Sequence, residues 1–189
     1  MVVEAIKKIK FNIMDYLFTS ARLGFRNWQE KDKIPFAKMN ADKDVMEFFP
    51  KTPTKKESDT LADRLKKHYV NYGFTFFAVD ELSTNNFIGF IGFINTSFTA
   101  YFTPCIEIGW RLQKTSWHKG FATEGAKRCL KYGFEELNFK EIYSITPLKN
   151  SKSENVMLKI GMKKQGTFEH PSIEDNHWLK TELLYKITK

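Results

Sequence analysis

The residues whose types and spacing most clearly suggest a chemical role form a turn between an apolar segment and an amphipathic one. The turn reads Trp117-His118-Lys119-Gly120-Phe121-Ala122-Thr123-Glu124. A glycine turn that opens a helix leaves several backbone N–H groups unpaired, and the helix dipole adds about half a positive charge there. Such a turn predicts a cradle for a phosphate-bearing ligand. The alternative is a plain strand-to-helix turn, since neither G-x-x-x-x-G-K-[ST] nor G-x-G-x-x-G is present.

Composition places the chain among ordinary globular proteins. Its 189 residues are 42% hydrophobic and 28% charged, which suits one domain with a real core. The two cysteines, Cys105 and Cys129, form neither a metal spacing nor a disulfide framework, so we expect a reducing, cytoplasmic location and no metal. No apolar run reaches about 18 residues, and we therefore expect no membrane partner.

The net charge of +8 favours an anionic ligand but does not indicate a nucleic-acid protein. Lys and Arg are scattered along the chain and form no single stripe. A basic surface without any ligand explains the charge equally well. Nucleic-acid binding is therefore disfavoured as the main role.

The elements that must position the turn follow from periodicity. We expect residues 1–18 to form an N-terminal extension, with a short basic amphipathic helix over residues 2–18, and residues 19–188 to form one α/β domain. Strands are expected at residues 21–28, 74–79, 87–95, 105–113, 141–146, 162–168 and 177–187. Helices are expected within residues 32–49, from a capping box at Thr54 and Glu57 to Gly73, over residues 120–137, and over residues 150–160. The strand–helix–strand order around residues 105–146 implies one parallel strand pair.

Four sequence blocks, in this order, resemble the GNAT superfamily of acyl-CoA-dependent N-acetyltransferases. They are Glu-Ile-Gly-Trp-Arg-Leu (107–112), the turn at 117–124, Asn-Ser-Lys-Ser (150–153) and Lys-Ile-Gly-Met (159–162). Their spacing is similar to the branch that contains the ribosomal-protein N-terminal acetyltransferases. The resemblance implies a single mixed, mostly antiparallel sheet of about six to seven strands, flanked by helices, in which the parallel pair splays apart at a bulge. It also admits a homodimer.

The resemblance assigns acetyl-CoA to the turn. The diphosphate of CoA would be bound by Trp117, His118, Lys119, Gly120, Phe121, Ala122 and Thr123, with Lys114 adding charge. The pantetheine arm would pair with Trp110 and Leu112 and contact Asn150 and Ser153. Many relatives carry a Tyr as general acid where this chain has Met157.

Catalysis would then be direct attack of an amine on the acetyl thioester. Glu107 is the candidate general base and Ser153 the candidate donor toward the departing thiolate. Each has a structural alternative: Glu107 as a strand carboxylate paired with Arg111 or another basic residue, and Ser153 as a first-turn helix residue. His170 and His177 are candidate substrate contacts, and five aromatic residues could shape the acceptor pocket: Phe48, Phe49, Phe98, Tyr101 and Phe102.

The acceptor is open between a peptide N-terminal α-amine, which we favour slightly, and a small-molecule amine such as a polyamine or antibiotic. An acidic pocket would indicate a cationic small molecule, and an open groove would indicate a peptide. A non-catalytic acyl-CoA-binding module is the alternative from another class.

Overall fold

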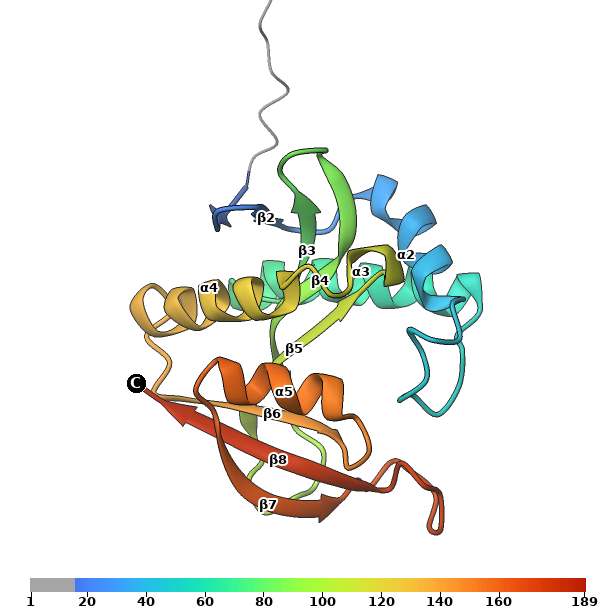
Figure 1. Ribbon diagram of the computed structural model, residues 1–189, viewed down its shortest axis with the longest axis vertical. Coiled ribbons are helices and arrows are strands. Elements are labelled where there is room, and N and C mark those ends of the chain that lie inside the picture. The colour runs from blue at the N-terminus through green and yellow to red at the C-terminus, as the bar shows by residue number, and fades with distance from the viewer. Residues whose placement is uncertain (1–15) are drawn as a thin grey trace, which may run out of the picture.

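The computed structural model describes residues 16–189 (Figure 1). Most of the predicted N-terminal helix, residues 2–15, lies outside the described residues. Its predicted end is wrong, because Phe18 belongs to a strand instead of a helix. The N–H of Leu17 donates to the carbonyl of Phe25 at 2.8 Å, so this segment starts a tight hairpin.

A mixed sheet of eight strands forms the centre of the domain. The strands are β1 (Phe18–Thr19), β2 (Leu23–Arg26), β3 (Phe76–Glu81), β4 (Asn86–Thr96), β5 (Cys105–Leu112), β6 (Glu141–Pro147), β7 (Lys163–Glu169) and β8 (Thr181–Thr188). Their spatial order is β1-β2-β3-β4-β5-β6-β8-β7, and β5–β6 is the parallel pair among otherwise antiparallel neighbours. The predicted mixed sheet with one splayed parallel pair is confirmed, with β1 adding to the expected six to seven strands.

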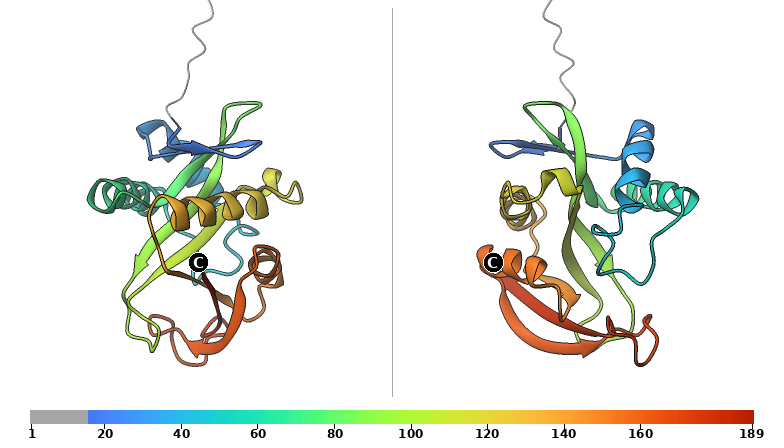
Figure 2. Two further views of the ribbon diagram at one scale, coloured as in Figure 1. Left: turned by 90° about the vertical axis from the view of Figure 1, so that its left-hand side faces the viewer. Right: turned by 45° about the vertical axis from the view of Figure 1, so that its right-hand side comes forward.

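Helices cover both faces of the sheet. They are α2 (Lys33–Asn40), α3 (Lys55–Tyr72), α4 (Phe121–Glu135) and α5 (Ser151–Lys159), with short 3-10 turns at η1 (Glu30–Asp32) and η2 (Lys114–Ser116). Figure 2 shows α4 and α5 on one side of the sheet and α2 and α3 on the other. The domain is therefore a three-layer sandwich with a separate core on each face.

The two cores follow from the sequence pattern of the strands. Ile91, Phe93 and Ile108 point toward α4, which buries Ala126 and Cys129 against them. Phe90 points to the opposite face, where the second core gathers Trp28, Phe36, Met39, Ala62 and Leu65 beneath α2 and α3. Burial raises the pKa of the Cys105 and Cys129 thiols, and Cys129 is a fully buried core residue.

The predicted helix signals are confirmed in α3. Thr54 accepts a hydrogen bond from the Glu57 N–H, and the Glu57 carboxylate accepts one from the Thr54 N–H, which forms the capping box. Gly73 ends the helix in the left-handed conformation with φ of 76°. His68 is a packing residue whose Nδ1 lies 2.7 Å from the Phe74 carbonyl.

A buried ion group ties β2 to β3 and to the start of α2. Arg26 contacts Asp32 and Asp80, each at 2.7 Å, and all three side chains are at most 2% exposed. The Tyr16 hydroxyl donates a further hydrogen bond to Asp80 at 3.3 Å. Because both carboxylates share one guanidinium, the group fixes the first hairpin against the sheet.

Candidate active site

The parallel strands β5 and β6 diverge toward their carboxyl ends. A single residue pair, Glu107 with Tyr143, links them, whereas β5 pairs with β4 over its full length. The Ser144 hydroxyl donates to the Ile108 carbonyl at 2.9 Å, just beyond that pair. The register of β5 with β4 has no shift, so the bulge expected in this region is absent and the divergence lies on the β6 side alone.

The edge of β5 that faces the divergence offers free backbone groups. The Gln113 N–H donates to the Ile88 carbonyl of β4, whereas the Ile108 carbonyl points to β6. Backbone direction alternates along a strand, so the polar groups of Trp110 and the N–H of Leu112 also face β6. No strand within residues 16–189 pairs with them there. These groups suit an extended amide-bearing chain such as pantetheine, as the sequence predicted for Trp110 and Leu112.

The predicted phosphate turn joins the end of β5 to α4. Gly120 caps the helix with φ of 79°, and His118 also has a positive φ of 61°. The first backbone bond of the helix runs from the Glu124 N–H to the Gly120 carbonyl at 3.0 Å. The N–H groups of residues 120–123 have no acceptor within residues 16–189. A Cβ on Gly120 would meet nothing nearer than the Arg22 guanidinium at 3.6 Å, so the cradle is open toward an anion.

Arg22 is a residue of this turn that the sequence reasoning missed. Its guanidinium stacks on Phe121 at 4.6 Å and contacts Glu124 at 2.6 Å. It reaches the turn from the β1–β2 hairpin, about 100 residues away in sequence, and no local pattern signals that approach. Glu124, in the first turn of α4, accepts hydrogen bonds from Arg22 and Ser20. Lys114, expected to add charge, instead pairs with Asp44.

Trp117 anchors the turn to the strand. Its indole Nε1 donates to the Leu112 carbonyl at 2.8 Å, and the Lys152 ammonium lies 4.8 Å from its ring centroid. Since Lys152 belongs to α5, this one side chain connects β5, the turn and α5 across the divergence. Trp117 therefore has a positioning contact in addition to its predicted place in the turn.

The start of α5 faces the same divergence. Asn150 caps the helix, because its Oδ1 accepts a hydrogen bond from the Ser153 N–H at 3.2 Å. The Ser153 side chain is half-buried, and its hydroxyl has no hydrogen-bond partner within residues 16–189. Met157 is fully buried core, so no hydroxyl occupies the position where many relatives carry the acidic Tyr.

Glu107 lies on the other side of the sheet plane, on the α2–α3 face of β5. The Thr96 hydroxyl donates to its Oε2 at 2.6 Å. Burial raises the pKa of Glu107 to about 7, and the Thr96 hydrogen bond acts in the opposite direction. A carboxyl with this pKa is suited to take a proton near neutral pH. Glu107 and Ser153 thus come from opposite sides of the divergence and make no direct contact.

The alternative interpretation of Glu107, pairing with Arg111, is wrong. Arg111 donates instead to Asn40 at 2.8 Å and stacks on Phe49 at 4.0 Å. Burial lowers the pKa of Arg111 to about 10. Its Nε is buried without a partner within the described chain.

Glu182 is a second carboxyl that the sequence reasoning missed. It is 6% exposed, and its Oε2 is buried without a hydrogen-bond partner within residues 16–189. Burial raises its pKa to about 8, and the charge of Glu107 adds to the rise. The sequence held one signal: an acidic residue directly before the apolar Leu183 and Leu184 in a predicted strand.

The aromatic residues expected around an acceptor divide into two groups. Phe98 and Phe102 pack on Phe168, with centroids 6.0 and 4.9 Å apart. Phe48 packs on Trp178 at 5.9 Å. Tyr101 is 73% exposed and packs on Phe102, with ring centroids 5.4 Å apart.

Both candidate histidines brace the closing loop. The Nδ1 of His170 accepts the Ser172 N–H, and the Nδ1 of His177 accepts the Leu179 N–H, each at 3.2 Å. His170 also contacts the Phe98 ring at 4.6 Å. These bonds give each ring a structural role.

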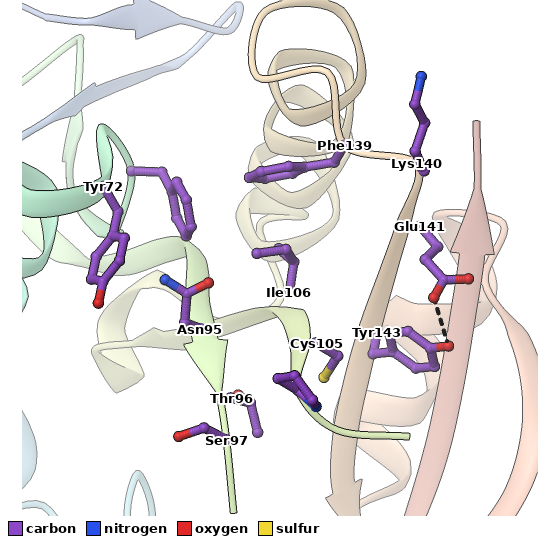
Figure 3. Close-up of a pocket in the computed structure, with 12 residues that line it drawn as sticks. Tyr72, Asn95, Thr96, Ser97, Cys105, Ile106, Phe139, Lys140, Glu141 and Tyr143 are labelled. Carbon is purple, nitrogen blue, oxygen red and sulfur yellow. Dashed lines mark hydrogen bonds between the residues drawn. The ribbon is translucent and has the colours of Figure 1, made fainter. Parts of the chain in front are cut away.

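A pocket of ≈ 500 Å³ lies at the opposite end of β5 from Gly120 (Figure 3). Tyr72, Phe139, Cys105 and Tyr143 are among its lining residues. Thr96 also lines this pocket, and its hydroxyl donates the hydrogen bond to Glu107. Its position at the start of β5 separates it from the phosphate turn, so we do not assign CoA to it.

Residues 16–189 contain no grouping of His, Cys, Asp and Glu side chains placed to hold a metal ion. None of the helices in this part of the chain is long and apolar enough to cross a bilayer.

The fold and the site together define a class of protein. A mixed sheet whose single parallel pair diverges beside a glycine turn is the arrangement expected from the resemblance. The family model of the acetyltransferase (GNAT) domain matches residues 22–163. The chain belongs to the GNAT family and is an N-acetyltransferase.

One sequence relative supports this assignment, and two solved structures share the fold. The uncharacterized N-acetyltransferase YnaD of Bacillus subtilis (strain 168) is 30% identical over 162 residues, covering 85% of this chain and 90% of that protein. Spermidine N-acetyltransferase from Vibrio cholerae, solved with CoA and spermine, has a TM-score of 0.71 at 21% identity, covering 89% and 96% of the two chains. Ribosomal-protein-S5-alanine acetyltransferase from Vibrio fischeri has a TM-score of 0.72 at 17% identity, covering 90% and 95%. The two structures share the fold of this chain.

Proposed function

We propose that this enzyme transfers the acetyl group of acetyl-CoA directly to a primary amine. The unpaired N–H groups of residues 120–123 carry the proposal, because they provide a positive, open cradle for the CoA diphosphate. Arg22 adds a guanidinium at the same turn. The free backbone groups of Trp110 and Leu112 would bind the pantetheine arm and lead the thioester into the divergence of β5 and β6.

The reaction then needs a proton acceptor and a charge stabiliser. The amine nitrogen forms a bond to the acetyl carbon, the carbon–sulfur bond breaks, and the proton of the amine passes to Glu107. The N–H of Leu112 would polarise the thioester oxygen, a contribution typically worth about 3–4 kcal/mol. The Ser153 hydroxyl would donate a hydrogen bond to the departing thiolate.

How much the reaction needs Glu107 as a base depends on the basicity of the acceptor amine. About a tenth of an α-amine with pKa near 8 is neutral at pH 7, whereas a lysine-like amine with pKa near 10.4 is only about 0.04% neutral. The base is therefore more important for the second kind of acceptor. The related folds include enzymes named for a polyamine and for a ribosomal-protein N-terminus, so the comparisons leave both acceptor classes open.

The test is release of free CoA thiol from acetyl-CoA in the presence of amines and peptides. We expect release with at least one acceptor class, and we expect calorimetry to detect CoA binding. Glu107→Gln should lower turnover by about 100-fold or more, whereas CoA affinity should stay unchanged. If Glu107→Gln and Ser153→Ala both retain full turnover, the assigned roles are wrong even if the acetyl transfer is real.

A further inference from the structure

Glu107 and Glu182 project from the same face of the sheet, on the two sides of the β5–β6 divergence. Residues directly opposite each other in neighbouring strands share a face, and every second residue returns to it. Glu107 is opposite Tyr143, and Pro147, four residues further along β6, is opposite Glu182. The two carboxyls therefore face one region. The charge of Glu107 acts on the Glu182 carboxyl, as expected for groups within electrostatic range.

Neither carboxyl has a positive partner in the part of the chain that the structure describes. Within residues 16–189, no Lys, Arg or His forms an ion pair with Glu107 or Glu182. The chain nevertheless carries 30 Lys and Arg against 22 Asp and Glu. Burying two facing carboxyls without a cation is costly, and a structural carboxylate normally acquires a partner. The missing charge would be supplied by a bound cation.

The surroundings of Glu182 suit an organic cation. Phe168 lies directly opposite Glu182 on β7 and stacks with Phe98. Aromatic faces attract ammonium groups when water is excluded. Burial and the charge of Lys180 lower the pKa of the neighbouring His170, which disfavours a positive charge on that ring.

From these observations we propose that Glu182 binds a second positive charge of the acceptor, so that the enzyme prefers diamines and longer polyamines to monoamines. The reacting amine would lie at Glu107 and the second ammonium at Glu182. This inference rests on the proposed function, because it names the acceptor class of that same site. It favours a cationic small molecule over a peptide N-terminus without a second nearby ammonium.

The experiment compares matched acceptors by CoA thiol release. Butylamine and putrescine have the same four-carbon chain and differ in the second amine, and pentylamine and cadaverine form a second such pair. For the wild-type enzyme we expect kcat/KM to be at least about tenfold higher for each diamine, the scale of one charge-assisted contact. A peptide with an uncharged second residue should have a kcat/KM similar to that of the monoamines.

Glu182→Gln is the diagnostic variant, because it keeps the shape and removes the charge. We expect the diamine preference to fall to about twofold or less while kcat/KM for the monoamines is retained. Glu169→Gln is the matched control: Glu169 is an exposed carboxylate on the neighbouring strand, opposite Thr181, and so points to the other face. It should keep the full preference. Glu182→Asp, which preserves the charge, should retain part of the preference and serves if the glutamine variant is unstable.

The outcomes separate the two proposals. If the wild-type enzyme acetylates monoamines and diamines equally, or if Glu182→Gln keeps the diamine preference, the inference about Glu182 is wrong although acetyl transfer stands. A preference for the neutral peptide that Glu182→Gln does not alter overturns it as well. If no acceptor releases thiol, the proposed function itself fails.

Discussion

The Thr96 hydroxyl donates a hydrogen bond of 2.6 Å to the carboxylate of Glu107. Burial raises the pKa of Glu107 to about 7, and this hydrogen bond opposes the rise because it stabilises the charged form. Glu107, the candidate base, therefore changes protonation near neutral pH, and the Thr96 hydrogen bond helps to set the pH at which this happens.

Removing the Thr96 hydroxyl should shift the pH dependence of catalysis. With butylamine, whose own pKa lies well above the range, we expect kcat/KM of the wild-type enzyme to rise with a step near pH 7 as Glu107 loses its proton. In Thr96→Val the step should move up by about one unit, since a hydrogen bond to a charged group is worth roughly 1.5–3 kcal/mol and one unit is about 1.4. Thr96→Ser keeps the hydroxyl and should keep the step near pH 7. An unshifted step in the valine variant would exclude Glu107 as the titrating group.

Stability should fall as the pH rises through the range where Glu107 and Glu182 lose their protons. Their pKa values, about 7 and about 8, lie above the ordinary value of 4.5, so the folded state holds more protons than the unfolded state from about pH 4.5 to 8. The free energy of unfolding therefore decreases with pH in that window. Glu182→Gln should raise Tm at pH 8.5 by at least about 2–4 °C, the shift that 1 kcal/mol gives in a chain of this size, and leave it nearly unchanged at pH 5. A Tm difference that is the same at both pH values would contradict the raised pKa.

The local elements of the fold could be predicted because their signals lie within a few residues of each other. The capping box at Thr54, the stop at Gly73 and the turn at Gly120 all depend on neighbours in the chain. The alternation in β5 placed Glu107 and Arg111 on one face. The short strand at Phe18 could not be foreseen, because two paired residues carry no periodicity.

The partners of the site residues could not be predicted in the same way. Arg22 meets Glu124 across 102 positions, and Arg26 meets Asp80 across 54. Lys114 has the right charge for a phosphate, but the fold places Asp44 beside it. Such pairings depend on how strands and loops assemble, and a single sequence holds no record of that.

The buried group around Arg26 should be important for stability. Its guanidinium lies 2.7 Å from both Asp32 and Asp80. Arg26→Met leaves two buried carboxylates without a cation, so we expect the free energy of unfolding to fall by about 3–5 kcal/mol. The control is Lys55→Ala, which breaks the exposed ion pair with Asp59. It should change the free energy of unfolding by less than about 1 kcal/mol. Urea unfolding followed by circular dichroism measures the free energy of unfolding of both variants. Equal losses of stability in the two variants would show that the Arg26 group is no more important than a surface ion pair.

A side chain at Gly120 should weaken CoA binding beyond its effect on stability. Gly120 has φ of 79°, a conformation that costs other residues about 1–2 kcal/mol, and its Cα faces the open cradle where the diphosphate would lie. Gly73 provides a matched control, because its φ of 76° is nearly the same and it lies at the end of α3 with nothing within 4 Å of an added Cβ. Gly120→Val and Gly73→Val should therefore lose similar amounts of stability in thermal unfolding. Calorimetry should find CoA affinity reduced at least about tenfold in Gly120→Val alone, as expected if the side chain displaces the phosphates from the N–H groups. Equal CoA affinity in the two variants would place the diphosphate elsewhere and would remove the main support for the proposed function.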